Sequence, residues 1–384
     1  MLNALDSGAV NVAVPMVFDD EDAVERLRRD RAEDVVGVFS NPRIRATAKV
    51  ECGDAAVGTS KTVSTRFERA RLLASGLDGS GVDIAVVDTG IKSDPERVEI
   101  ANLAGGWHPT RSDYQPGTTR RERGANGTHG TMCAWNAQLF APEASIYDYA
   151  LLQSKEDSWT GFLSDAIDAF VSLIEHRERR KRPLVVNNSW AIYDPESEDL
   201  PVGDPGNYSA NPSHPFNVVV RRAIAAGADV VFAAGNCGGD CPDGRCGECA
   251  GEGRSIHGAA GLADVLTVAG VATTRARLGY SSQGPSSITL AKPDLCAYAH
   301  FVGSGVYADD EGGDSGTSTA APLVAGLVAA LRTKVPSMSA AALASVLRRT
   351  ATALEAPGFD YGFGYGLIDP VAAAKALGIR LERS

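Results

Sequence analysis

Residues with reactive side chains occur at three glycine-flanked positions of this chain. Ser318 lies in Gly-Thr-Ser-Thr-Ala-Ala-Pro, directly before an apolar helical run. His129 lies in Asn-Gly-Thr-His-Gly-Thr, and Asp88 lies in Val-Val-Asp-Thr-Gly after an apolar run. A serine hydroxyl is a weak nucleophile until a base removes its proton, and a histidine oriented by a carboxylate is such a base. These residues predict acyl transfer by an Asp–His–Ser triad.

Strand and helix patterns alternate along most of the chain. Apolar runs predict buried strands at 82–87, 145–149, 184–187, 230–233 and 265–271, and helical spacing predicts helices at 160–175, 218–226, 320–331 and 339–351. This alternation is typical of a parallel α/β sheet, whose active sites gather at the carboxyl ends of its strands. Asp88 and Asn236 each follow a strand pattern, so we expect both at that edge.

The chain order Asp, His, Ser is the order found in subtilisin. With the residues that flank Asp88, His129 and Ser318, the sequence resembles the subtilisin-like serine proteases (subtilases) from about residue 64 to the C-terminus. The resemblance implies an α/β, three-layer subtilisin-like fold with a mainly parallel central sheet flanked by helices. It also implies a serine endopeptidase that acts through an acyl-enzyme and requires no cofactor for its chemistry.

Further site residues follow from the same resemblance. Asn236, in Ala-Ala-Gly-Asn, matches the family's oxyanion-hole asparagine, whose side-chain amide acts with the backbone N–H of Ser318. Such donors stabilise the negative oxygen of the tetrahedral intermediate. Subtilase substrates pair as a strand with a Ser-Leu-Gly-type segment, which here reads Ser189-Trp190-Ala191. We therefore expect Ser189, Trp190 and Gly235 to bind substrate.

Two features bear on substrate preference. The bulk of Trp190, at a position that is usually leucine, is expected to narrow the specificity pocket. Glu252 falls in the region expected to line that pocket, which would favour a basic side chain before the scissile bond. The long polar loop at 193–217 fits either a lid over the cleft or a surface insertion.

The chain is expected to have two parts, a small α/β N-terminal unit at 1–60 and the catalytic domain at 61–384. Strand patterns occur at 11–18, 35–39 and 44–50, and a helical pattern at 21–31. This arrangement resembles the inhibitory propeptide of subtilases, and the alternative is a permanent accessory domain. The Gly/Ser/Thr-rich stretch at 58–65 is expected to be a linker and a processing region.

Four of the seven cysteines form a cluster directly after Asn236. Cys237, Cys241, Cys246 and Cys249 have the spacing C-x3-C-x4-C-x2-C. Four thiolates at this spacing fit a structural zinc site, two disulfides fit equally well, and free thiols are the third alternative. No other residues give a firm metal site.

Composition restricts partners and location. The net charge of −11 argues against a nucleic-acid partner, and no run approaches the length of a membrane span. The N-terminus lacks the basic start of a signal peptide, so a cytoplasmic location is expected, with export open if the start site is misassigned. The expected partners are protein or peptide substrates and the chain's own N-terminal segment as a cleft inhibitor. A location inside the cell favours specific processing over general digestion.

Two other functions fit the same sequence. A non-catalytic scaffold would keep the N-terminal unit docked in the cleft and use the cysteine loop to bind a partner. An acyl transferase or peptide ligase would use the same acyl-enzyme, with an amine in place of water.

Overall fold

The computed structural model describes residues 2–3, 10–11, 14, 16–17, 21–31, 35, 37–47, 55–154, 159–195, 198–253, 255–307 and 313–382. Its centre is a seven-stranded sheet in the order β12-β11-β10-β8-β4-β6-β5, with every neighbouring pair parallel. The strands are β4 Asp83–Val87, β5 Leu103–Trp107, β6 Ser145–Tyr149, β8 Leu184–Asn188, β10 Ala228–Ala233, β11 Leu266–Val271 and β12 Leu295–Tyr298. The expected α/β fold with a mainly parallel sheet is confirmed.

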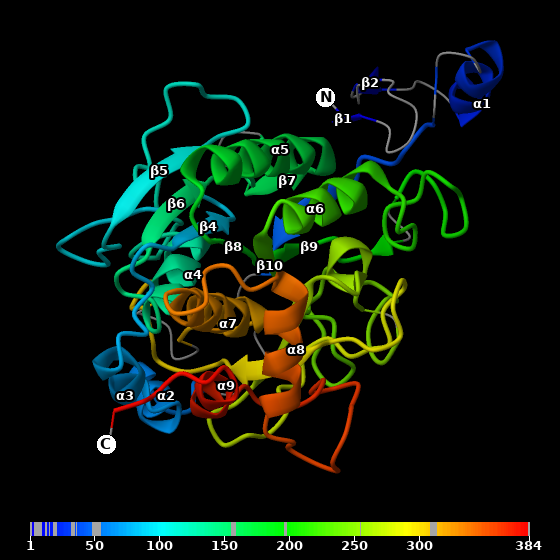
Figure 1. Ribbon diagram of the computed structural model, residues 1–384. Coiled ribbons are helices and arrows are strands. Elements are labelled where there is room, and N and C mark those ends of the chain that lie inside the picture. The colour runs from blue at the N-terminus through cyan, green and yellow to red at the C-terminus, as the bar shows by residue number, and fades with distance from the viewer. Residues whose placement is uncertain are drawn as a thin grey trace.

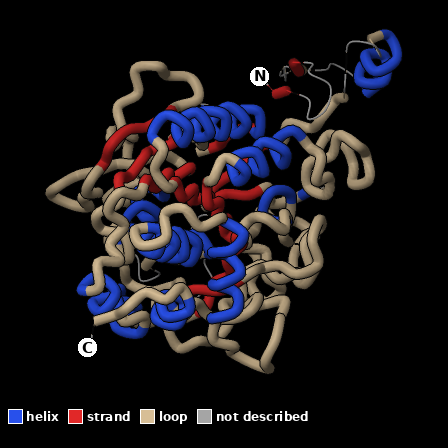
Figure 2. Tube along the Cα trace, viewed as in Figure 1, coloured by secondary structure: helices blue, strands red, loops and turns tan. Residues whose placement is uncertain are grey.

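Helices cover both faces of this sheet and complete the three layers (Figures 1 and 2). On one face lie α5 (Leu163–Arg180) and α6 (Pro215–Ala225), and on the other lie α4 (His129–Gln138) and α7 (Thr317–Arg332). Every residue of α7 is buried. Close packing of α7 on α4 requires glycine, because a Cβ at Gly326 would lie 2.1 Å from the carbonyl oxygen of Ala137. The other described α-helices are α1 Glu21–Asp30, α2 Ser60–Arg66, α3 Arg69–Ala74, α8 Ala340–Thr350 and α9 Pro370–Ala376.

A separate three-stranded antiparallel sheet, in the order β7-β3-β9, joins the N-terminal part of the chain to the rest. Its strands are β3 Arg43–Ala46, β7 Thr160–Phe162 and β9 Trp190–Ala191. The strand predicted at 44–50 therefore exists in its described part, but it pairs with strands of the catalytic domain on both sides. Burial alternates along β3, and Ile44 and Ala46 face inward.

Part of the predicted N-terminal unit at 1–60 lies outside the described residues. The described part includes α1, where a helix was predicted, and the short pair β1 (Leu2–Asn3) and β2 (Val10–Asn11). Residues 37–39 are irregular, not the predicted strand.

The predicted linker at 58–65 is wrong, because helix α2 begins there. Thr59 and Thr62 form a capping box that satisfies backbone groups at the start of this helix.

No helix in the described residues is long and apolar enough to span a bilayer.

Candidate active site

Asp88 and His129 meet where the first two glycine-flanked motifs pack together. Asp88 directly follows β4, and His129 is the first residue of α4. The Nδ1 atom of His129 lies 2.7 Å from Oδ1 of Asp88, and both side chains are buried. The start of α4 packs closely against the turn that contains Gly90. This packing requires glycine at position 130, because a Cβ there would lie 2.5 Å from the carbonyl oxygen of Gly90. The glycines around these two residues therefore permit the contact between them.

Burial and charge act in opposite directions on His129. Burial lowers its pKa, but the charge of Asp88 and the hydrogen bond to it raise the pKa, and the net direction is well upward. The Cys133 sulfur lies 3.6 Å from Oδ2 of Asp88 and 3.8 Å from Nδ1 of His129. Burial raises the pKa of the Cys133 thiol to about 11. Although these three side chains lie close enough to share a metal ion, a protonated thiol and an occupied Nδ1 fit a metal poorly.

Ser318 is the second residue of α7, after Gly316, whose φ of 81° favours glycine. Pro322 lies four residues later and has no N–H to donate to the carbonyl oxygen of Ser318. That oxygen instead lies 3.6 Å from the sulfur of Cys133 and 3.5 Å from Oγ of Ser189. The first turn of α7 is therefore tied to both α4 and the end of β8.

The side-chain amide of Asn236 has a defined orientation. Its Oδ1 accepts hydrogen bonds from the backbone N–H and the hydroxyl of Thr317, at 2.9 and 3.0 Å. Gly235 adopts φ of 104° and donates its N–H to the Thr317 hydroxyl at 3.1 Å. The amide nitrogen of Asn236 is thereby directed to the carbonyl oxygen of Thr47, 3.1 Å away.

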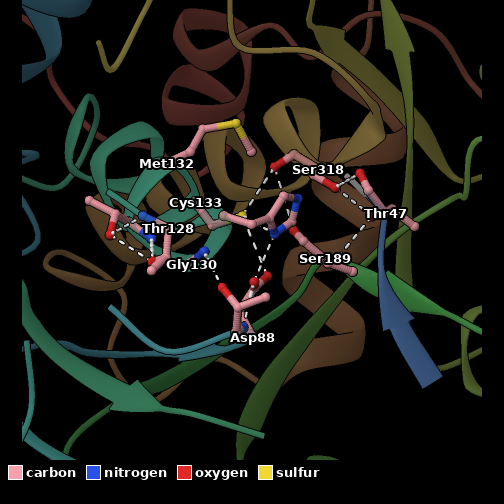
Figure 3. A network of polar contacts seen from close by, with 12 residues as sticks. Thr47, Asp88, Thr128, Gly130, Met132, Cys133, Ser189 and Ser318 are labelled. Atoms are coloured by element: carbon pink, nitrogen blue, oxygen red, sulfur yellow. Dashed lines mark hydrogen bonds and ion pairs between the residues drawn. The ribbon is translucent and has the colours of Figure 1, made fainter. Parts of the chain in front are cut away.

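The Thr47 carbonyl is contacted by both the Ser318 hydroxyl and the Asn236 amide. Figure 3 shows the hydroxyl of Ser318 beside Thr47, where it contacts both the carbonyl oxygen and the hydroxyl of that residue. The backbone N–H of Thr47 donates to the carbonyl oxygen of Ser189 at 2.9 Å. The Nε2 atom of His129 is buried and has no hydrogen-bond partner within the described ranges. The N-terminal segment thus presents a peptide carbonyl to a hydroxyl and an amide.

Strand β3 is held at the end that adjoins Thr47 by two residues that the sequence did not predict. The carbonyl oxygen of Ala46 accepts hydrogen bonds from Tyr193 at 2.9 Å and from Arg245 at 3.2 Å. The Arg245 guanidinium also lies 4.0 Å from the centre of the Tyr193 ring. The only sequence signal for Arg245 was its place in the cysteine cluster, beside Asn236.

Two further residues position the site without having been predicted. Glu122 accepts a hydrogen bond from the backbone N–H of His129 at 2.6 Å and another from the Tyr307 hydroxyl at 3.1 Å. Burial raises the pKa of Glu122. Thr317, which orients Asn236, directly precedes the predicted nucleophile, and its place in that motif is a signal that could have identified it.

Of the alternatives for the cysteine cluster, the structure has a disulfide between Cys237 and Cys246. Cys241 is also disulfide-bonded. Cys249 remains a thiol, and its sulfur lies 3.6 Å from Oδ1 of Asp194. A four-thiolate zinc site is therefore wrong for this cluster, because disulfide sulfurs are not thiolates. The disulfide begins at the residue after Asn236 and packs on Tyr193.

Replacing Cys237 and Cys246 together by serine is expected to lower the free energy of unfolding by about 2–3 kcal/mol, since the disulfide closes a loop with a sequence separation of 9. Denaturant unfolding of the double variant and of the wild type measures this difference. Cys249→Ser is the matched control and should unfold like the wild type. Equal stability of the double variant and the wild type would show that the cross-link is dispensable.

The space between Trp190 and the end of β10 is narrow. Trp190 is buried and packs on Phe216 and Phe232, with ring centres 5.5 and 5.2 Å apart. A cavity of about 10 Å³ lies between residues 190–192 and residues 232–234, and Trp190 and Phe232 help to line it. Glu252 is exposed and does not line this cavity, so the basis for a basic side chain before the scissile bond is absent.

Comparison with known proteins agrees with the fold and with the residue pattern. The model of the subtilase family matches residues 79–366, so the chain belongs to this family. Subtilisin E of Bacillus subtilis is 28% identical over 310 residues, which cover 79% of this chain and 68% of that protein. Subtilisin BL of Lederbergia lenta is 29% identical over 307 residues, covering 78% and 93%.

Solved structures show the same fold. MycP1 with its N-terminal propeptide removed matches with a TM-score of 0.59 at 21% identity, covering 81% of this chain and 96% of that one. The S41 psychrophilic protease matches with a TM-score of 0.56 at 22% identity, covering 76% and 92%. Family membership makes this chain a subtilisin-like serine endopeptidase.

Proposed function

We propose that Ser318 is the nucleophile of this endopeptidase. Its hydroxyl attacks the carbonyl carbon of a substrate peptide while Nε2 of His129 accepts the proton. Asp88, 2.7 Å from Nδ1, keeps the imidazole oriented and stabilises its charged form. His129 then donates the proton to the leaving amine, which departs. A water molecule attacks the acyl-enzyme in the same way and regenerates the Ser318 hydroxyl.

The oxyanion of the tetrahedral intermediate is bound by the amide of Asn236 together with the backbone N–H of Ser318. The observation that carries the proposal is the carbonyl of Thr47, which contacts the Ser318 hydroxyl and accepts from Asn236 at 3.1 Å. A carbonyl in this position is placed like that of a bound substrate. Donors already directed at the reacting oxygen stabilise charge without rearrangement.

The N-terminal segment acts, in this proposal, as both the inhibitor and the first substrate of the enzyme. Strand β3 fills the space between β7 and β9, where an extended protein substrate would add a strand. The bond positioned for attack is the one that Thr47 makes with the next residue, Ala48. The fit of this segment to the cleft supports a protease that processes specific sequences.

The disulfide at Cys237 supports export as the setting for this activity. Disulfides persist in oxidising compartments and are rare in the cytosol. We therefore favour an exported enzyme over the cytoplasmic location that the N-terminal sequence suggests.

We propose that the narrow cavity lined by Trp190 and Phe232 receives the side chain before the scissile bond, which favours cleavage after small residues. A cavity of about 10 Å³ is close to the space that one water molecule needs, so a large side chain would have to displace Trp190 from its aromatic neighbours. A peptide with the sequence of residues 38–51 is expected to lose roughly 10- to 100-fold in kcat/KM when phenylalanine replaces Thr47. Alanine at the same position is the control and should be cleaved at a comparable rate. Faster cleavage of the phenylalanine peptide would refute this preference.

A fluorophosphonate probe tests the proposed chemistry directly. The wild type should be labelled at Ser318, and peptide mapping identifies the labelled residue. Hydrolysis of the 38–51 peptide, followed in the presence of an added amine, distinguishes transfer to water from transfer to the amine. Failure of labelling together with failure of hydrolysis would leave the scaffold function as the better description.

A further inference from the structure

The loop between β9 and α6 binds Ser40, a residue that precedes Thr47 in the chain. Ser40, seven residues before Thr47, is buried against this loop. Its hydroxyl donates to Oε2 of Glu198 at 2.7 Å, and its backbone N–H donates to the carbonyl oxygen of Gly206 at 2.8 Å. Its carbonyl oxygen lies 3.0 Å from Nε2 of His214. Every polar group of Ser40 is therefore bound by the loop.

The Glu198 carboxylate is prepared by its own loop. Its side chain is buried, and it accepts hydrogen bonds from the backbone N–H groups of Tyr208 at 2.7 Å and Ser209 at 3.0 Å. The Ser209 hydroxyl also contacts it. A buried carboxylate held by donors of the same loop is fixed in place and presents one oxygen to the hydroxyl of Ser40.

His214 completes the site from the start of α6. Its Nδ1 accepts from the backbone N–H of Phe216 at 3.2 Å, so the proton of the neutral ring lies on Nε2, which donates to the Ser40 carbonyl oxygen. Burial lowers the pKa of His214 to about 4, which keeps the ring neutral near pH 7. The Phe39 ring packs edge-on against His214, with centres 5.6 Å apart. The histidine is thus fixed in the form that can donate to a peptide carbonyl.

We propose that Glu198, His214 and Gly206 form a subsite that selects protein substrates with a serine seven residues before the residue whose carbonyl is attacked. The proposal rests on the proteolytic function above and specifies its substrates. In an extended chain this separation is about 23 Å, so the subsite lies far from the reacting carbonyl. Glu198 needs a compact hydroxyl donor, and an alanine in that place would leave one buried carboxylate oxygen with fewer donors. The loop at 193–217 is, in this view, neither a mobile lid nor a passive insertion.

Peptide cleavage in trans tests the subsite. Rates are expressed per active site, counted by fluorophosphonate labelling, for the 38–51 peptide and for its Ser40→Ala form. We expect the alanine form to lose about 10- to 100-fold in kcat/KM with the wild-type enzyme. The control peptide carries Arg43→Lys, because Arg43 is exposed on β3 and the change keeps its charge. This control should be cleaved like the parent peptide.

An enzyme variant assigns the effect to Glu198. In Glu198→Gln the ratio of rates for the serine and alanine peptides should fall close to one. In the matched control Asp199→Asn, an exposed neighbour in the same loop, the ratio should stay at its wild-type value. Cleavage of both peptides by the wild type within about twofold would overturn the subsite, and so would a ratio that persists in Glu198→Gln. If the enzyme neither reacts with the probe nor cleaves any peptide, the proteolytic function itself fails, and the subsite fails with it.

Discussion

A chain carrying Ser318→Ala is expected to keep all 384 residues joined, whereas the wild type should separate into residues 1–47 and 48–384. The Thr47 carbonyl contacts the Ser318 hydroxyl, and the reaction needs that hydroxyl as its nucleophile. Loss of the nucleophile in subtilisin itself reduces kcat by about 10⁶-fold, and we expect a loss of that size here. Intact mass spectrometry of the two purified proteins measures the outcome.

Ser315→Ala is the matched control for this experiment. Ser315 precedes α7, is buried, and its hydroxyl has no hydrogen-bond partner among the residues described. This variant should be processed like the wild type. Cleavage of Ser318→Ala at the bond after Thr47 would contradict the assignment of the nucleophile. Cleavage of the wild type at a different bond would show that β3 binds without being the first substrate.

Replacing Asn236 by alanine is expected to reduce kcat by about 10²–10³-fold, the magnitude known for the equivalent change in subtilisin itself. The amide nitrogen of Asn236 lies 3.1 Å from the Thr47 carbonyl oxygen, where negative charge develops as the carbonyl is attacked. Because this interaction strengthens in the transition state, KM should change much less than kcat. Steady-state cleavage of the 38–51 peptide separates the two constants.

A second variant separates the donor from the orientation of the side chain. Asn236→Asp keeps an oxygen that can accept from Thr317, but it replaces the amide donor by a negative charge. It should therefore lose at least as much kcat as the alanine variant. If either variant keeps kcat within about threefold of the wild type, the Asn236 amide does not stabilise the transition state.

The residues that align the site divide into those with a local sequence signal and those without one. Asp88, His129 and Ser318 each have glycines nearby in sequence, and each lies at the start or end of a helix or strand. Their motifs could therefore be identified in the sequence. Glu122 and Arg245 have no such flanks, and their roles come from contacts with His129 and with Ala46. Side chains that act through distant partners leave little trace in local sequence.

The cysteine cluster and the stretch at 58–65 illustrate the same limit. Spacing alone allowed zinc, disulfides or free thiols, because it does not show which sulfurs the fold brings into contact. The disulfide between Cys237 and Cys246 depends on how the loop folds beside Tyr193. At 58–65 the composition suggested a linker, but the capping box of Thr59 and Thr62 stabilises a helix.

By itself, the sequence determined five of the seven strands of the central sheet, several of the helices between them and the reactive residues at their ends, because apolar periodicity and glycine turns act over a few residues. It did not identify β5 (Leu103–Trp107) or β12 (Leu295–Tyr298). Only the tertiary structure decided what occupies the cleft. Thr47 and Ser318 are 271 residues apart, and β3 pairs with β7 and β9, which come from two further regions of the chain. Strand pairing over such separations depends on the shape and hydrogen-bonding edges of the folded domain, which no local pattern records.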